Sequence, residues 1–230
     1  MTTCNYCVMD QTDIEINFDE NNICNHCNDA FKNFPKYTFT KAQEIENLNK
    51  LSLEIKRKKR GEYDCIIGLS GGVDSSYLAH LAKTMDLNPL CVHFDNGWNS
   101  EISVSNIKKL VSKLNFSLKT VVIDWPEFRD LQRSFFSASV FDIEVLTDNA
   151  IIGSLRKIQK EYKISSILSG ANFTTEHGMP ETWSWSKMDL KNIKSIHKKF
   201  GKLKIKKIVG MSNLEYMFYR KTKIGCSFYE

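Results

Sequence analysis

Hydrophobic residues follow two rhythms in the chain from Tyr63 onward. Short apolar runs that suit buried strands alternate with longer segments in which apolar residues recur every three or four positions, as in amphipathic helices. The pattern predicts strands at 65–69, 88–94, 117–123 and 165–169, with helices at 74–85, 101–114, from Trp125 onward, and at 148–162. Such alternation is the signature of a parallel sheet with helical crossovers. The predicted fold class is therefore α/β, with a doubly wound parallel sheet.

The flanking segments show weaker patterns. Lys41–Arg60 has one apolar face and a basic end that suits a helix C-terminus. The remaining predictions are a strand at 14–18, a basic helix at 189–200, an edge strand at 203–209 and a short helix at 213–219. We therefore expect three parts: a small module at 1–36, a linking helix at 37–61 and an α/β domain at 62–230.

Composition narrows the class only slightly. Of the 230 residues, 42% are hydrophobic and 26% charged, which is ordinary for a globular protein. The net charge of +5 suits a phosphate-bearing substrate but does not argue for nucleic acid. No run of 18 apolar residues and no secretory leader is present, so we expect a cytoplasmic protein without a membrane partner. Cysteines in that compartment are more often metal ligands than disulfides.

Two Cys-x-x-Cys knuckles stand near the N-terminus. Cys4 and Cys7 form the first, Cys24 and Cys27 form the second, and sixteen residues separate the two knuckles. Each knuckle aims two sulfurs at one point, so the pair predicts a tetrahedral site for a structural Zn²⁺ in a zinc ribbon. His26 lies inside the second knuckle, where we expect it beside the ligands or exposed rather than bound to the metal.

A glycine-rich turn follows the first predicted strand of the α/β domain. Two adjacent glycines let the backbone approach a ligand, serine hydroxyls surround them, and the N–H groups of the next helix face the same space. This arrangement suits phosphate or pyrophosphate. The residues that we expect to bind the nucleotide here are Ser70, Gly71, Gly72, Asp74, Ser75 and Ser76.

Ligands of open α/β sheets bind beyond the carboxyl ends of the strands. After the second strand, Asp95 is a candidate Mg²⁺ ligand or, equally, a turn-capping residue, and Phe94 a candidate lining of an adenine pocket. After the fourth strand, Gly170 lets the chain turn close to a nucleotide, and Glu176 is a candidate for metal or substrate contact. Asp148 has the pattern of a helix cap.

The turn Ser70–Ser75 resembles the pyrophosphate loop of the N-type ATP pyrophosphatases, whose motif is Ser-Gly-Gly-x-Asp-Ser. It lacks the spacing and the lysine of a Walker loop. The resemblance implies a PP-loop domain at 62–230 that cleaves ATP between the α and β phosphates.

A longer series of matches, from Cys4 to about Phe200, is similar to the N-acetyl sugar amidotransferases of pseudaminic acid and lipopolysaccharide biosynthesis. The matching segments are Cys4–Asp10, Phe18–Asn21, Cys24–Cys27, Ser70–Ser75, His93–Asn99, Leu146–Asp148, Ser169–Asn172, Thr174–Glu176, Met179–Pro180 and Trp183–Asp189.

That resemblance implies Asp74, Asp95 and Glu176 as catalytic residues and adds His93 to the nucleotide site. It also implies a substrate site that includes Asp148, Thr174, Trp183, Trp185 and Lys187. The two tryptophans suit stacking on a sugar or base, or a packed lid.

The implied reaction uses ATP and Mg²⁺ to adenylate the N-acetyl carbonyl of a nucleotide-linked sugar. Ammonia from a separate glutamine amidotransferase subunit then displaces AMP. Family members are longer than this chain, so the resemblance implies a short C-terminus. Two alternatives stay open: a tRNA-thiolating or tRNA-modifying enzyme, which usually needs further reactive cysteines, and a non-catalytic nucleotide-binding scaffold.

Overall fold

The computed structural model describes residues 2–171, 180–183, 185–206, 210–212, 214–217 and 227–229. Within these ranges the chain divides into two compact units. One contains Met1–Asn47 together with Ala171–Trp185, and the other contains Leu48–Gly170 together with Ser186–Glu230. The predicted division at residues 36 and 61 stays a prediction about which parts fold independently.

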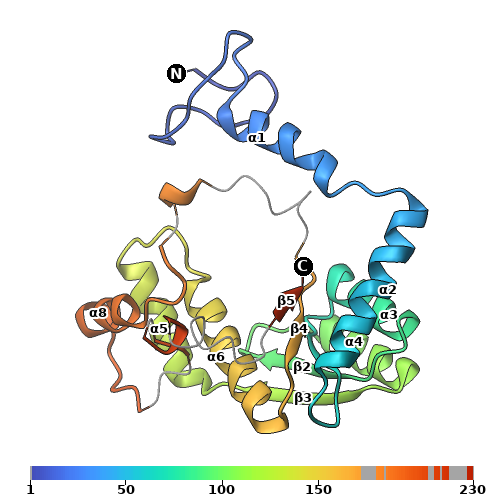
Figure 1. The fold of residues 1–230 in the computed structure, drawn as a ribbon. Helices are drawn as coiled ribbons and strands as arrows, with labels where there is room; N and C mark the ends of the chain where they lie inside the picture. Colours follow the sequence, from blue (N-terminus) through green and yellow to red (C-terminus); the bar gives the residue numbers. More distant parts are fainter. Residues whose placement is uncertain are drawn as a thin grey trace. The chain divides into compact units, whose positions relative to one another are not determined.

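The larger unit is built on a parallel sheet (Figure 1). Its strands are β1 (Cys65–Gly68), β2 (Pro89–Asp95), β3 (Ser117–Val122), β4 (Ser166–Leu168) and β5 (Ser227–Tyr229). They lie in the order β3-β2-β1-β4-β5, with all neighbouring strands parallel. The α/β prediction is confirmed. The order reverses between β1 and β4, which is the topological switch point where such sheets bind ligands.

Helices connect these strands. The helices are α2 (Lys41–Lys58), α3 (Val73–Thr84), α4 (Glu101–Leu114), α5 (Trp125–Ser137), α6 (Val145–Tyr162) and α8 (Leu190–Phe200). The predictions for α2 to α5 and α8 are confirmed to within two residues. Helix α6 begins at Val145, three residues before the predicted start, with Glu144 as its N-cap. The expected capping role of Asp148 is therefore wrong, because Asp148 lies within the first turn of the helix.

Alternate strand residues build two cores, one on each face of the sheet. Ile67 of β1 packs with Ile55 of α2 and Ile107 of α4. Its neighbour Ile66 packs with Ile158 of α6 in a second cluster. Successive strand side chains point to opposite faces, so an uninterrupted apolar strand requires helices on both. Helix α2 is therefore more than a connection, because its second half covers the sheet.

A third apolar cluster joins α5 and α8. Phe135, fully buried, packs there with Leu131, Val145 and Ile193. The chain after α8 does not form the edge strand predicted at 203–209, as far as residues 203–206 show. Its backbone N–H groups bond to α5 instead: Leu203 donates to Asp130 and Lys206 to Glu127. The strand that pairs with β4 on the side away from β1 is β5, which the apolar pattern did not predict.

Asp130 should make the stability of the larger unit depend on pH. Burial works to raise the pKa of its carboxyl, but hydrogen bonds from the backbone of Leu203, from His197 and from the backbone of Lys202 outweigh burial and lower that pKa. A lowered folded-state pKa stabilises the fold above the unfolded value of about 3.9, and this stabilisation is lost as the pH falls through the folded-state pKa.

We expect Asp130→Asn to reduce the free energy of unfolding by about 1.5–3 kcal/mol at pH 7, the range for hydrogen bonds to a charged group. The difference from the native chain should begin to shrink below about pH 4, where the carboxyl of the unfolded chain protonates, and should be lost below the lowered pKa of the folded carboxyl. Urea unfolding at pH 7 and pH 3 measures both values. Asp86→Asn is the control, because the Asp86 side chain is 99% exposed. An equal loss at both pH values would contradict the assignment.

The smaller unit has little regular structure. Its described residues include α1 (Asn25–Asn33), the beginning of α2, and the short 3-10 helices η1 (Phe34–Lys36) and η2 (Glu181–Trp183). The strand predicted at 14–18 is wrong. Its residues form a turn in which Ile16 donates to the Asp13 carbonyl, and Phe18 makes a single antiparallel bridge to Cys24.

Candidate functional site

The glycine turn lies at the switch point of the sheet. β1 ends at Gly68, and α3 begins at Val73 with Gly72 as its N-cap. Gly72 has no side chain to accept a bond from the first turn, so the N–H groups at the start of α3 remain available for an anion. A phosphate bound here would also meet the positive end of the helix dipole.

Serine hydroxyls hold this turn together. The Oγ atoms of Ser70 and Ser75 are 3.1 Å apart, and the backbone N–H of Ser70 also donates to Ser75 Oγ. Ser76 Oγ donates to the carbonyl of Gly72 at 2.7 Å. Asp74 lies in the first turn of α3 and is exposed. The loop is thus pre-formed in the protein and keeps the backbone of its two glycines accessible.

Gly71 is required by both conformation and space. Its φ angle is +81°, and a Cβ there would lie 2.5 Å from the carbonyl oxygen of Ser103 in α4. Gly170, after β4, lies on the other side of the loop: a Cβ added to it would be 3.5 Å from the backbone of Asp74. The segments after β1 and β4 therefore meet at the start of α3, as predicted for the carboxyl edge of a parallel sheet.

The loop after β2 is fixed by its own side chains. Asp95 Oδ1 accepts bonds from the Gly97 N–H and from Asn99 Nδ2, both at 3.0 Å. Trp98 packs edge-on against Trp125, the first residue of α5, with ring centres 5.5 Å apart. One oxygen of Asp95 therefore serves the turn, which was one of the two expected roles. Its metal-binding role stays a prediction.

His93 and Phe94 precede that loop on β2. His93 is buried, and its Nδ1 lies 3.0 Å from the carbonyl oxygen of Leu69, directly before the glycine turn. Phe94 is half-buried. The structure thus places His93 beneath the start of the pyrophosphate loop, and its nucleotide-binding role stays a prediction.

The candidate substrate residues lie in different places. Lys187 forms an ion pair with Asp148. Burial lowers the pKa of Lys187, but Asp148 outweighs this effect and raises it. Trp183 is half-buried in η2, and Trp185 is 61% exposed. The remaining two, Thr174 and Glu176, lie outside the described residues.

Asn149 was missed from the sequence, although it organises the chain near Lys187. It is fully buried in α6, and its Nδ2 donates to the carbonyls of Lys187 and Met211 at 2.8 and 3.0 Å. Its Oδ1 accepts the Met211 N–H at 3.2 Å. One amide thus ties α6 to two later segments. The sequence gives little signal for this role, because the buried residues of α6 also include other polar side chains, such as Arg156 and Gln159.

The four predicted cysteines converge on one point in the smaller unit. Their sulfur atoms all lie within 4.8 Å of one another, with Cys4 and Cys27 3.9 Å apart and Cys7 and Cys24 3.7 Å apart. Four thiolates around a tetrahedral Zn²⁺ at about 2.3 Å have sulfurs about 3.8 Å apart. The spacing of the four sulfurs therefore fits a tetrahedral metal ion such as Zn²⁺, and these four cysteines would be its ligands.

Backbone N–H groups favour the thiolate form of Cys4 within the cluster. Burial works to raise the pKa of Cys4, but hydrogen bonds from the backbones of Cys7, Cys24 and Tyr6 outweigh burial and lower it to about 6. Burial raises the pKa of Cys27. A bound cation supplies the charge that would stabilise such buried thiolates.

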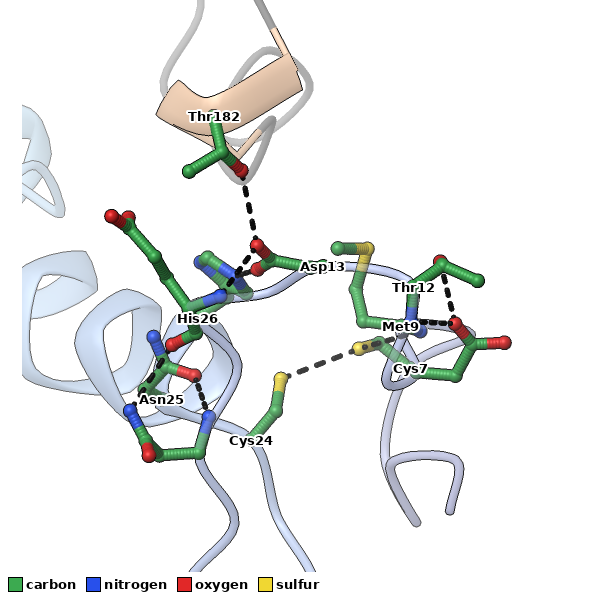
Figure 2. Close-up of polar contacts among 11 residues, drawn as sticks. Cys7, Met9, Thr12, Asp13, Cys24, Asn25, His26 and Thr182 are labelled. Atoms are coloured by element: carbon green, nitrogen blue, oxygen red, sulfur yellow. Dashed lines mark hydrogen bonds and ion pairs between the residues drawn. The ribbon is translucent and has the colours of Figure 1, made fainter. Parts of the chain in front are cut away.

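Asp13 and His26 form an ion pair next to the cysteines (Figure 2). His26 Nε2 and Asp13 Oδ2 are 2.7 Å apart, and the hydrogen bond from His26 lowers the pKa of Asp13. His26 lies beside the ligands, as expected. Asp13 was missed, because nothing in the sequence distinguishes it from a surface acid.

The fold and the loop together define the class. A parallel α/β sheet with a Ser-Gly-Gly-x-Asp-Ser turn at its switch point is characteristic of the PP-loop enzymes, which are of the ATP pyrophosphatase type. The model of one family, NAD synthase, matches residues 45–165, just over half of the chain. The chain therefore belongs to the NAD synthase family, which confirms the superfamily resemblance.

Among the solved structures that the chain resembles are three that are distant in sequence. The glutamine-dependent NAD+ synthetase of Acinetobacter baumannii, in complex with ADP, is 20% identical with a TM-score of 0.48; the match covers 60% of this chain and 27% of that one. The NH3-dependent NAD synthetase of Campylobacter jejuni is 15% identical over 70% of this chain and 73% of that one, with a TM-score of 0.47. The NMN synthetase of Francisella tularensis is 16% identical over 81% and 85%, with a TM-score of 0.46.

The chain thus spans about a quarter of the Acinetobacter protein. No curated protein matches it. Among the described residues, none of the helices has the length and apolar character needed to cross a membrane.

Proposed function

We propose that the protein is an AMP-forming amidotransferase that acts on the N-acetyl group of a nucleotide-linked sugar. The carbonyl oxygen of the acetamido group attacks the α phosphate of ATP, and pyrophosphate leaves. Ammonia then adds to the activated carbon, AMP departs with the former carbonyl oxygen, and an acetamidino group remains. The ammonia comes from a glutamine amidotransferase partner.

One observation carries the proposal. The Ser70–Ser76 segment joins β1 to the start of α3 at the switch point, with uncapped helix N–H groups and with Gly170, which follows β4, alongside. The leaving pyrophosphate would bind to these N–H groups and to the hydroxyls of Ser70 and Ser75. Donors already in place where negative charge develops are the main means by which proteins promote such transfers.

Asp95 is the residue that we assign to Mg²⁺, together with the phosphate oxygens. Asp74 and Glu176 complete the proposed catalytic set. Mg²⁺ would neutralise charge that builds up on the phosphates. For the sugar we assign Asp148, Lys187 and the two tryptophans Trp183 and Trp185, and Thr174 with them. Lys187 is paired with Asp148, so an anionic group of the substrate would compete with that carboxylate.

The cysteines favour this reaction over tRNA thiolation. Of the cysteines in the described ranges, those outside the cluster are Cys65 and Cys91, and both are fully buried within strands. Burial raises the pKa of Cys65, and it raises the pKa of Cys91 to about 12. Buried thiols with raised pKa values are poor nucleophiles and cannot carry sulfur to a bound base.

The second candidate is the activity in the name of the matched family, the synthesis of NAD. It shares the adenylation and ammonia steps but starts from a carboxylate. The four-cysteine centre, which forms part of the resemblance to the sugar amidotransferases, favours the sugar.

A mass-spectrometric assay distinguishes the candidates. The protein is incubated with ATP, Mg²⁺, ammonium and either a panel of N-acetamido nucleotide sugars, the deamidated precursor of NAD, or tRNA with a sulfur donor. AMP formed with a sugar that is 1 Da lighter, because NH has replaced O, supports the proposal. AMP formed together with NAD would instead support NAD synthesis, and AMP formed together with thiolated tRNA would instead support tRNA thiolation. ATP binding without AMP from any of the three would indicate a scaffold.

A further inference from the structure

Asp13 is a buried charge that the proposed reaction does not use. Asp13 is only 1% exposed, and each of its two carboxylate oxygens has at least one polar partner. Oδ2 pairs with His26, and Oδ1 accepts the backbone N–H of Glu15 and the hydroxyl of Thr182, each at 3.1 Å. A carboxylate withdrawn from water is stable only with such partners, so its bonds are costly to break.

Thr182 comes from a distant part of the chain. It lies in η2, 169 residues after Asp13 and in the segment that follows β4. That segment, Ala171–Trp185, belongs to the same compact unit as the four cysteines. Figure 2 shows Thr182 of η2 pointing at Asp13, with His26 on the other side of the carboxylate.

The contacts continue from Asp13 to the cysteines. His26 stands between Cys24 and Cys27 in sequence, at the start of α1. Its position is set by the same turn that brings these two sulfurs to the cluster. A cluster drawn together by a cation therefore places His26, His26 orients Asp13, and Asp13 accepts the hydroxyl of Thr182.

We propose that Asp13 is a positioning residue through which the four-cysteine centre holds the segment 180–183. Metal loading then does more than fold the N-terminal module: it sets the position of the segment that carries Trp183. The consequence for substrate binding rests on the proposed function, in which Trp183 contacts the sugar. The predicted effect on the position of the segment does not depend on the proposed function.

Hydrogen exchange tests the position of the segment directly. The hydroxyl of Thr182 is removed by Thr182→Val, which keeps the shape of the side chain, and is retained by Thr182→Ser. Thr182 is exposed, so neither change should unfold the protein. The amide to follow is that of Trp183, which donates to the carbonyl of Pro180. In the zinc-loaded full chain we expect faster exchange of this amide in Thr182→Val and native exchange in Thr182→Ser. Removing zinc from the native chain should speed exchange there to at least the level of Thr182→Val.

Kinetics and metal content separate positioning from other roles. With the sugar identified by the assay above, we expect Thr182→Val to raise KM for the sugar about tenfold while kcat stays within about twofold, because one hydrogen bond to a charged group is lost. Thr182→Ser should restore the native KM, and zinc content should be native in both variants.

A native rate of amide exchange in the segment 180–183 of Thr182→Val would overturn the inference. So would an exchange rate in the native chain that does not change when zinc is removed. Raised exchange with an unchanged KM would overturn its consequence for substrate binding. A protein that converts no sugar contradicts the proposed function, while the exchange data still decide whether Asp13 holds the segment.

Discussion

Gly71→Ala is expected to lower the rate of AMP formation about 100-fold, the loss typical when a reacting group is displaced by about 1 Å. The φ angle of +81° at Gly71 costs a residue with a side chain roughly 1–2 kcal/mol. The added methyl group would also lie 2.5 Å from the carbonyl oxygen of Ser103. That neighbour is backbone, so no side-chain rotation relieves the contact, and the loop itself must shift.

Gly68→Ala is the matched control. Gly68 ends β1, three residues earlier, and a Cβ there meets nothing within 4 Å. We expect this variant to retain near-native activity. Both variants should retain native circular dichroism, since the changes are confined to one turn. ATP affinity and AMP formation, measured side by side, provide the test. Native activity in Gly71→Ala would show that pyrophosphate does not bind on this turn.

Cys24→Ser is expected to abolish stable zinc binding and to disorder the N-terminal module. Cys24 is fully buried, and its sulfur lies 3.7 Å from that of Cys7. The apolar cluster around the cysteines is small, formed by partly buried side chains such as Met9, Phe18 and Ile23. Binding of a structural zinc ion is worth about 10–16 kcal/mol in small zinc modules, far more than this cluster can supply.

Metal content per chain and amide exchange over residues 2–33 measure both effects. The native chain should carry one zinc ion, and Cys24→Ser far less than one. Cys91→Ala is the control: Cys91 is equally buried, but in β2 and outside the cluster, so zinc content should not change. A Cys24→Ser chain that keeps its zinc and its slow exchange would show that the cluster is not the metal site.

The local pattern of the sequence was sufficient for most of the larger unit. Short apolar runs identified β1, β2 and β4, because a strand covered on both faces is apolar along most of its length. The prediction also held for β3, which is partly exposed and includes Lys119 and Thr120. The Ser-Gly-Gly-x-Asp-Ser motif located the pyrophosphate turn, since only glycine tolerates the conformation and close approach found at Gly71. The Cys-x-x-Cys spacing located the four-cysteine cluster, because each knuckle brings two sulfurs together without help from the rest of the chain.

The same reasoning from hydrophobic alternation failed where carboxylate side chains compete for the backbone N–H groups. Alternation at 14–18 indicated a strand, but the carboxylate of Asp13 accepts the N–H of Glu15 and holds a turn there. Alternation from Leu203 onward also indicated a strand, but Asp130 and Glu127 of α5 take the backbone N–H groups at 203 and 206. In both cases a side chain supplied the partner that a neighbouring strand would have offered.

The sequence by itself determined the α/β class, the anion-binding turn and the cysteine cluster, because each depends on residues within one turn, strand or knuckle. Only the tertiary structure decided that His93 lies beneath the turn, that Asn149 joins α6 to Lys187 and Met211, and that Asp13 accepts a bond from Thr182. Those contacts join residues 24 to 169 positions apart. No local periodicity encodes such pairs, because they form only when the packing of the whole unit brings buried polar groups within reach of one another.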